Sequence, residues 1–261
     1  MARQPRKISE TGVYHVVFRG VNHCHLFEEQ KDFEKLLNIL TKIKEDLSIE
    51  VYAYCLLDNH VHLLLKEASA GDISLVMKRL LTPYAFWFNR KYQRSGALIA
   101  NRYKSECVTS NEYLLTLVRY IHQNPLLAGV TKRIDSYRYS SYLAYSKQRQ
   151  SLVDTAFVLG MLADDRGTAL RELIDFHDNL ETADYSLSDK PRKNDRQVRE
   201  EIAACLGGME PNALCGLPKA ARDPVLVSLK EKGFSIRQIE RITGVPRNII
   251  ARARLPLKKE E

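Results

Sequence analysis

Two short apolar stretches joined by one turn dipeptide constrain the fold of this 261-residue chain more than any other feature. IEVYAYCLL (49–57) and HVHLLLK (60–66) are rich in β-branched, aromatic and other apolar residues. Asp58-Asn59, which separates them, is a dipeptide typical of tight turns. The two stretches therefore predict a β-hairpin.

Strand and helix patterns on both sides of the hairpin predict one mixed domain. VYHVVFRG (13–20) indicates a strand, and residues 30–47 and 73–92 carry apolar side chains at helical spacing. A short strand near 102–108 and a helix over about 110–123 follow. The order β-α-β-β-α-β predicts an α+β fold, a ferredoxin-like antiparallel sheet with helices on one face.

The last of these helices has marked ends. Thr109 and Glu112 have the spacing of a capping box, which predicts the helix start. Pro125 predicts the helix end, because the residue before a proline avoids helical geometry.

Composition divides the chain into four segments. We expect a first domain over residues 1–145 and a helical extension over 146–180. Residues 181–197 are polar and charged, which is typical of a linker. Residues 198–261 form the last segment, predicted to be a small all-helical domain.

The last domain shows the pattern of a helix-turn-helix. Ser235 and Gln238 form a capping box, Gly244 marks a turn, and Pro246 is placed to start the next helix. From Lys219 onward there are eleven Lys and Arg and five Asp and Glu, a net +6 out of +8 for the chain. A generic three-helix packing module is the alternative, but the charge favours DNA binding. The side chains expected to contact DNA are Arg247, Asn248, Arg252 and Arg254.

Two histidines interrupt the second strand of the hairpin. Alternate strand residues share a face, so His60 and His62 lie side by side, opposite the apolar row of Val61, Leu63 and Leu65. Such a pair can chelate one metal ion, with zinc, manganese or iron as the usual partners of imidazole. Two hydrogen-bonded structural histidines are the alternative.

Three motifs together resemble one known family. NHVHLLL, then RYKS, then LVRYIHQNPLLAG are similar to the REP-associated tyrosine transposases, members of the single-tyrosine HUH superfamily, over roughly residues 8–145. The resemblance implies a nuclease domain that cleaves single-stranded DNA at palindromic REP hairpins and transfers strands through a covalent 5′-phosphotyrosine. It further implies Tyr120 as the nucleophile and a divalent metal, Mg2+ or Mn2+, as cofactor. The implied metal ligands are His60, His62 and Asn124.

Other residues compete for these roles. Arg102 and Lys104 flank Tyr103 in a basic stretch, and we expect them to contact DNA phosphates unless they form an ordinary solvated edge. Tyr103 and Tyr113 are alternative nucleophiles. His23-Cys24-His25 is a second H-x-H pattern, for which a polar loop is favoured over a zinc site.

The totals bound the remaining hypotheses. Five scattered cysteines argue against a disulfide framework, and no run is long enough to span a membrane. We expect a cytoplasmic, nucleoid-associated bacterial protein with DNA as partner, either monomer or homodimer. The alternative to the enzyme is a non-catalytic, sequence-specific DNA-binding regulator. A zinc hydrolase is the third hypothesis, for which the sequence shows no third ligand or general base.

Overall fold

The computed structural model describes residues 6–146, 152–187 and 195–254. The chain divides into two compact units, Met1–Leu187 and Ser188–Glu261. Of the predicted linker 181–197, residues 188–194 lie outside the described part. No helix in the described part is both long and apolar enough to cross a membrane.

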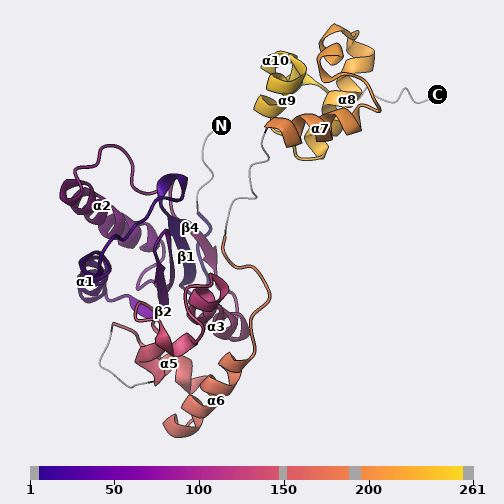
Figure 1. Ribbon diagram of the computed structural model, residues 1–261. Helices are drawn as coiled ribbons and strands as arrows, with labels where there is room; N and C mark the ends of the chain where they lie inside the picture. Colours follow the sequence, from indigo (N-terminus) through magenta and orange to yellow (C-terminus); the bar gives the residue numbers. More distant parts are fainter. Residues whose placement is uncertain (1–5, 147–151, 188–194, 255–261) are drawn as a thin grey trace. The chain divides into compact units, whose positions relative to one another are not determined.

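A four-stranded antiparallel sheet is the centre of the first unit (Figure 1). Its strands are β1 (Val13–Arg19), β2 (Glu50–Leu57), β3 (His60–Lys66) and β4 (Lys104–Cys107). They lie in the order β2-β3-β1-β4, and each neighbouring pair is antiparallel. The predicted hairpin and the ferredoxin-like sheet are therefore confirmed.

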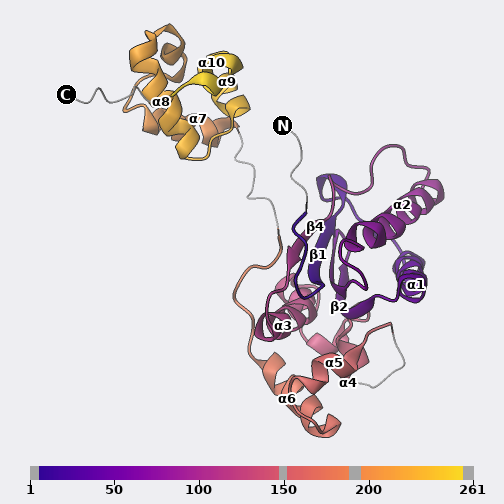
Figure 2. The same cartoon turned by 180° about the vertical axis from the view of Figure 1, so that it is seen from behind.

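Two helices of the β-α-β-β-α-β motif cover one face of this sheet (Figures 1 and 2). They are α1 (Gln30–Leu47) and α2 (Ile73–Lys91). The apolar row of β3 packs beneath them, in one core with their buried side chains. For these two helices, the prediction of helices on one face holds.

A third helix, α3 (Asn111–Leu127), covers the opposite face (Figures 1 and 2). A second apolar core lies between α3 and the sheet, and it also includes side chains of the helical extension. The extension consists of α4 (Tyr142–Ser146), α5 (Thr155–Gly160) and α6 (Arg166–Asp178). The histidine face of β3 is consequently buried rather than solvated.

Helix α3 begins where predicted, but its N-cap lies one residue later than predicted, and the predicted end was wrong. The N-cap is Ser110, whose side chain accepts a hydrogen bond from the backbone N–H of Tyr113 at 3.2 Å, so Thr109 lies before the helix. Pro125 lies inside the last turn, and the helix continues to Leu127. A proline near a helix end removes only one intrahelical hydrogen bond, and here the backbone N–H of Ala128 still bonds to Asn124 O at 2.8 Å.

The outer edge of the sheet, β2, is covered by the chain that follows α3. After the 3-10 turn η2 (Ile134–Ser136), the carbonyl of Tyr139 accepts from the backbone N–H of Leu56 at 3.0 Å. The backbone N–H of Ser141 donates to Tyr54 O at 2.9 Å. These bonds satisfy backbone groups that an open edge strand would leave unpaired.

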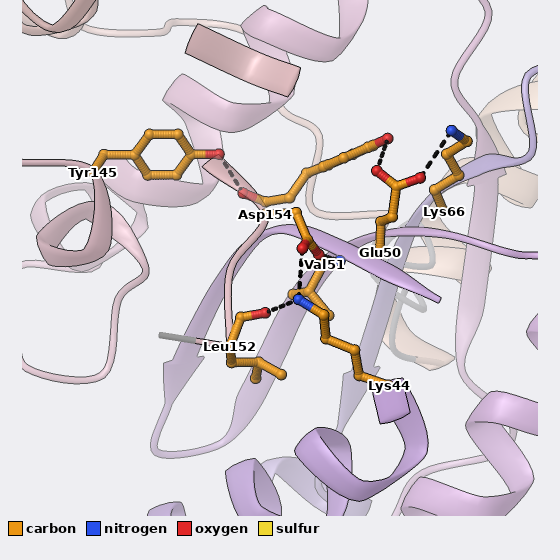
Figure 3. Close-up of polar contacts among 8 residues, drawn as sticks. Lys44, Glu50, Val51, Lys66, Tyr145, Leu152 and Asp154 are labelled. Carbon is orange, nitrogen blue, oxygen red and sulfur yellow. Dashed lines mark hydrogen bonds and ion pairs between the residues drawn. The ribbon is translucent and has the colours of Figure 1, made fainter. Parts of the chain in front are cut away.

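An ion pair and a backbone hydrogen bond attach the extension to the same edge (Figure 3). Asp154 accepts from Lys44 Nζ at 2.7 Å and from the backbone N–H of Val51 at 2.8 Å. Beside it, Glu50 accepts from Lys66 Nζ at 2.9 Å. The carboxylate of Asp154 thereby joins α1, β2 and the chain before α5.

The second unit is helical in its described part. It contains α7 (Asp195–Cys205), the 3-10 turn η3 (Pro211–Gly216), α8 (Lys219–Glu231), α9 (Ile236–Thr243) and α10 (Arg247–Arg252). The predicted capping box of α9 is present, and Gly244 ends the helix with φ of 73°. The small core includes Ile239, Ile242, Val245 and Ile250.

Candidate functional site: a histidine and tyrosine cluster

Adjacent strands bring three histidines to the centre of the α3-facing side of the sheet. His60 and His62 share this face of β3, as their spacing predicted. In the antiparallel register Arg19 pairs with His60 and Val17 with His62, which places His15 one diagonal step away on β1. His15 was not among the predicted site residues, because a single histidine in a strand has no signal until the strand register is known.

His62 and His15 are hydrogen-bonded to each other in a fully buried pair. His15 Nε2 lies 3.0 Å from His62 Nδ1, and the rings stack with centroids 5.3 Å apart. Both side chains are 0% exposed. Burial lowers the pKa of His15 to about 3 and that of His62 well below its usual value, so both rings are neutral near pH 7.

His60 lies at the partly exposed end of the cluster. Its ring is 5.2 Å from that of His62, and its Nδ1 lies 2.7 Å from Asn59 Oδ1. Burial lowers the pKa of His60 to about 4, although a hydrogen bond with the Asn124 side chain acts in the opposite direction. His60 is therefore also neutral near pH 7.

Tyr120 extends from α3 toward the histidines. Its ring centroid lies 5.6 Å from His62 and 6.4 Å from His15, edge-on in both cases. Asn124, one helical turn on, donates from Nδ2 to Tyr120 O at 2.9 Å. Burial raises the pKa of Tyr120 to about 12, while a hydrogen bond with the Asn124 side chain lowers it.

Residues 181–187, which were predicted to be part of a linker, pack over this cluster. The Tyr185 ring lies 5.2 Å from the Tyr120 ring, edge-on, and the carbonyl of Ser186 accepts from Arg19 Nη2 at 2.8 Å. Glu181 forms an ion pair with Arg119 on α3. Tyr120 is consequently only 4% exposed. The polar composition of 181–187 held no sign of these contacts.

A second buried histidine pair joins α3 to α6. His122 Nδ1 lies 2.9 Å from His177 Nε2, and His122 Nε2 lies 2.8 Å from Ser141 Oγ. His177 Nδ1 lies 2.7 Å from Leu173 O, so this nitrogen donates and every ring nitrogen of the pair has a partner. The pair therefore fixes α6 against the helix that carries Tyr120.

The alternative nucleophiles have different surroundings. Tyr103 packs in the core on the opposite face of the sheet, where the guanidinium of Arg6 lies 3.6 Å from its ring centroid. Tyr113 lies near the start of α3, with its ring 5.8 Å from that of Tyr185. No ring contact in the described structure joins either tyrosine to His60 or His62.

The predicted DNA contacts of the first unit lie on or beside an edge strand. Arg102 is exposed just before β4. Lys104 pairs with Val17 in the sheet and so lies on the same face as the histidines.

The tight loop after β1 lies next to the Asp58-Asn59 turn, which precedes His60. It contains the 3-10 turn η1 (Val21–His23), and Gly20 donates its backbone N–H to Asn59 O at 2.9 Å. A Cβ on Gly20 would lie 2.0 Å from the carbonyl oxygen of Cys24, so this position requires glycine. Cys24 Sγ contacts Leu98 O at 3.7 Å.

The predicted recognition side chains of the second unit lie on its surface. Arg247 forms an ion pair with Glu240, and Asn248 Oδ1 accepts from the backbone N–H of Ile249 at 3.0 Å. The four predicted residues are all exposed: Arg247, Asn248, Arg252 and Arg254.

The donor atoms of the cluster fit a divalent metal. His62 Nε2 is buried and has no hydrogen-bond partner among the described residues, so this nitrogen can bind a ligand when it carries no proton. Neutral imidazoles are the form that metals bind. No group of three or more His, Cys, Asp or Glu in the described part is arranged to hold a metal. The three implied ligands are two histidines and the amide of Asn124, so they are not a group of three His, Cys, Asp or Glu residues.

Comparison with known proteins places this geometry in context. Residues 9–124 match the family model described as Transposase IS200 like. A REP-associated tyrosine transposase bound to a REP hairpin is 16% identical, with a TM-score of 0.49 over 60% of this chain and 96% of that one. A candidate transposase from Deinococcus radiodurans R1 is 19% identical, with a TM-score of 0.33 over 47% of this chain and 95% of that one. Comparison with curated proteins gave no match.

The matched residues include the whole sheet and the residues of the cluster, from His15 on β1 to Asn124 on α3. The sheet and the cluster therefore lie within the part of this chain that is similar to the IS200-like transposases.

Proposed function

We propose that the first unit is a metal-dependent endonuclease and strand transferase that acts on single-stranded DNA beside palindromic REP-type hairpins. The family match gives the coarser activity, DNA processing of the transposase type. The observation that supports the finer one is the position of Tyr120, whose ring lies 5.6 Å from His62. A DNA-binding protein without chemistry has no need of a buried tyrosine beside neutral histidines.

The reaction assigned to Tyr120 is attack on a phosphodiester. A new bond forms between the phenolic oxygen and phosphorus, and the bond from phosphorus to the 3′-oxygen breaks. The phenol loses a proton and the departing 3′-oxygen gains one, which leaves a 5′-phosphotyrosine and a free 3′-hydroxyl. Attack by another 3′-hydroxyl reverses the step and joins a new strand.

The neighbouring residues have supporting roles. His60, His62 and Asn124 would hold a divalent ion such as Mg2+ or Mn2+, which when bound polarises the scissile phosphate. Asn124 also lowers the pKa of Tyr120 through its hydrogen bond, which opposes the effect of burial. Arg102 and Lys104 are proposed to contact the phosphates of the substrate strand.

The second unit is proposed to bind duplex DNA through α9 and α10. Arg247, Asn248 and Arg252 are exposed on α10 and Arg254 just after it, and α10 follows α9 after the short turn at Gly244. Helix, short turn and helix is the arrangement that places a recognition helix in the major groove.

A covalent-adduct assay tests the proposed chemistry. Protein is incubated with a labelled single-stranded hairpin, drawn from repeats flanking the gene, and with Mg2+ or Mn2+. Wild-type protein should give a metal-dependent adduct on a denaturing gel, whereas Tyr120→Phe and the double variant His60→Ala/His62→Ala should give none. Tyr113→Phe is the matched control in the same helix and should keep the adduct.

The opposite outcome is equally clear. Hairpin binding by wild-type protein without an adduct, with both metals and several hairpins, would identify a non-catalytic DNA-binding protein. Loss of the adduct in Tyr113→Phe but not in Tyr120→Phe would move the nucleophile to Tyr113.

A further inference from the structure

The buried ring of His15 stacks on the ring of His62, a proposed metal ligand. The chemistry proposed for Tyr120 gives His15 no role. His15 lies on β1, one of the two central strands, which pairs with β3, and its side chain is 0% exposed. The only hydrogen bond of its side chain in the described structure joins its Nε2 to His62 Nδ1 at 3.0 Å. Any polar role of the His15 side chain therefore acts through its hydrogen bond with His62.

The bond couples the protonation of two rings. Each neutral imidazole carries one N–H, and one of the two must lie in the bond between them. If His62 donates, His62 Nε2 has a free lone pair and His15 carries its proton on Nδ1. If His15 donates, His62 carries its proton on Nε2 and cannot bind a metal there. Only the first arrangement is compatible with metal binding.

The ends of the pair distinguish it from an ordinary structural contact. His15 Nδ1 and His62 Nε2 are both buried without a hydrogen-bond partner among the described residues. The His122–His177 pair, of similar geometry, has each outer nitrogen bonded, to Ser141 Oγ and to Leu173 O. The His15–His62 pair thus leaves two buried nitrogens without a partner, and one of them, His62 Nε2, belongs to a proposed metal ligand.

We propose that His15 is a positioning residue that accepts a hydrogen bond from His62 Nδ1 and so keeps the Nε2 lone pair of His62 available to the metal. The proposal rests on the proposed function, in which His62 is a ligand. Ligating histidines commonly donate their other ring N–H to a fixed acceptor, usually a carboxylate or a carbonyl. Here the acceptor is a second neutral imidazole, which adds no charge to the site.

Metal affinity measured without DNA tests this role. His15→Leu fills a similar volume with an apolar side chain that has no hydrogen-bond acceptor. In His15→Gln, the amide oxygen can still accept from His62 Nδ1. Mn2+ binding to the full chain is followed by electron paramagnetic resonance. We expect His15→Leu to bind Mn2+ about 10- to 100-fold more weakly, and His15→Gln to recover most of the affinity.

Two further variants separate the outcomes. Tyr84→Phe removes a buried hydrogen bond, from Tyr84 to Leu26 O, in the core on the other face of the sheet and should leave Mn2+ affinity unchanged. If His60→Ala/His62→Ala binds Mn2+ as wild type does, the proposed metal site is wrong, and the role proposed for His15 is wrong as well. If that double variant loses binding while His15→Leu retains it, only the role of His15 is wrong.

Nitrogen-15 NMR of the histidine side chains gives a second, independent readout. In metal-free wild-type protein His62 should carry its proton on Nδ1, and in His15→Leu that preference should be lost. The Nε2–H tautomer of His62 in wild-type protein would overturn the proposal.

Discussion

At the scale of single residues, burial makes the phenolic proton of Tyr120 hard to remove. The pKa of Tyr120 is raised to about 12, so the ionised nucleophile is scarce near pH 7. The described contacts that oppose this effect are the hydrogen bond with the Asn124 side chain and the charge of Arg19. Asn124 therefore has two tasks in the proposed mechanism, as a metal ligand and as a partner of the nucleophile.

Substitution of Asn124 should affect both tasks. In Asn124→Ala we expect the pKa of Tyr120 to rise above that of wild type, because the opposing hydrogen bond is lost. Adduct formation should slow by about 100-fold, in line with the loss of one positioned polar group. The pKa is measured by NMR with carbon-13-labelled tyrosine and the rate on denaturing gels. A variant with wild-type pKa and rate would show that Asn124 is only a helix residue.

At the scale of elements, the position of α3 depends on buried histidines that must stay neutral. Burial lowers the pKa of His177 to about 4 and that of His122 well below its usual value. Because the folded-state pKa lies below the unfolded value of about 6.5, the unfolded chain binds more protons in acid. The stability from these rings is thus complete above about pH 6.5 and is lost as the pH falls toward 4.

This linkage predicts acid sensitivity with a defined origin. The free energy of unfolding of the first unit should fall between about pH 6.5 and 4, with His177 alone contributing on the order of 3 kcal/mol. Denaturant titrations across this range measure the slope. The variant His122→Leu/His177→Leu should show a shallower slope, with the remainder due to the histidines of the cluster. An unchanged slope would contradict the assignment.

The segment over Tyr120 is a second element with an expected effect. Tyr185 covers the Tyr120 ring, and Asp184 raises the pKa of Tyr120 through its charge. Tyr185→Ala should therefore form the hairpin adduct faster than wild type, while Tyr185→Phe, which keeps the ring, should resemble it. Rates of adduct formation measure the effect. Slower formation in Tyr185→Ala would show that Tyr185 positions the nucleophile instead of covering it.

At the scale of the whole molecule, two units with different expected DNA partners are joined in one chain. The first has the sheet and the histidine cluster, and the second has the exposed basic side chains of α10. Phosphate contacts make binding depend on salt, so the contribution of the second unit can be measured separately.

Duplex binding tests the second unit. In Arg252→Ala/Arg254→Ala we expect weaker duplex binding and a slope of log affinity against log salt reduced by about two, one for each lost phosphate contact. Fluorescence anisotropy at several salt concentrations measures both values. The hairpin adduct should form as in wild type. Unchanged duplex binding would favour a packing module without DNA contacts.

Local patterns were enough for most elements of the fold. The helix predicted over 30–47 is α1, and the hairpin lies where its apolar runs and the Asp58-Asn59 turn predicted. These features depend on near neighbours in the chain, through periodicity and turn chemistry. The N-cap of α3 was displaced by one residue because Thr109 and Ser110 are both suitable caps, and in the structure Ser110 accepts the hydrogen bond from Tyr113.

Short-range periodicity was sufficient to predict the succession of strands and helices in the first unit, the shared face of His60 and His62, and the helical spacing of Tyr120 and Asn124. The positions of His15 behind His62 and of Tyr185 over Tyr120 depend on tertiary structure. The partners in these contacts are 47 and 65 positions apart in the chain. They meet through the register of β1 on β3 and the path of the chain after α6, which packing of the whole first unit fixes.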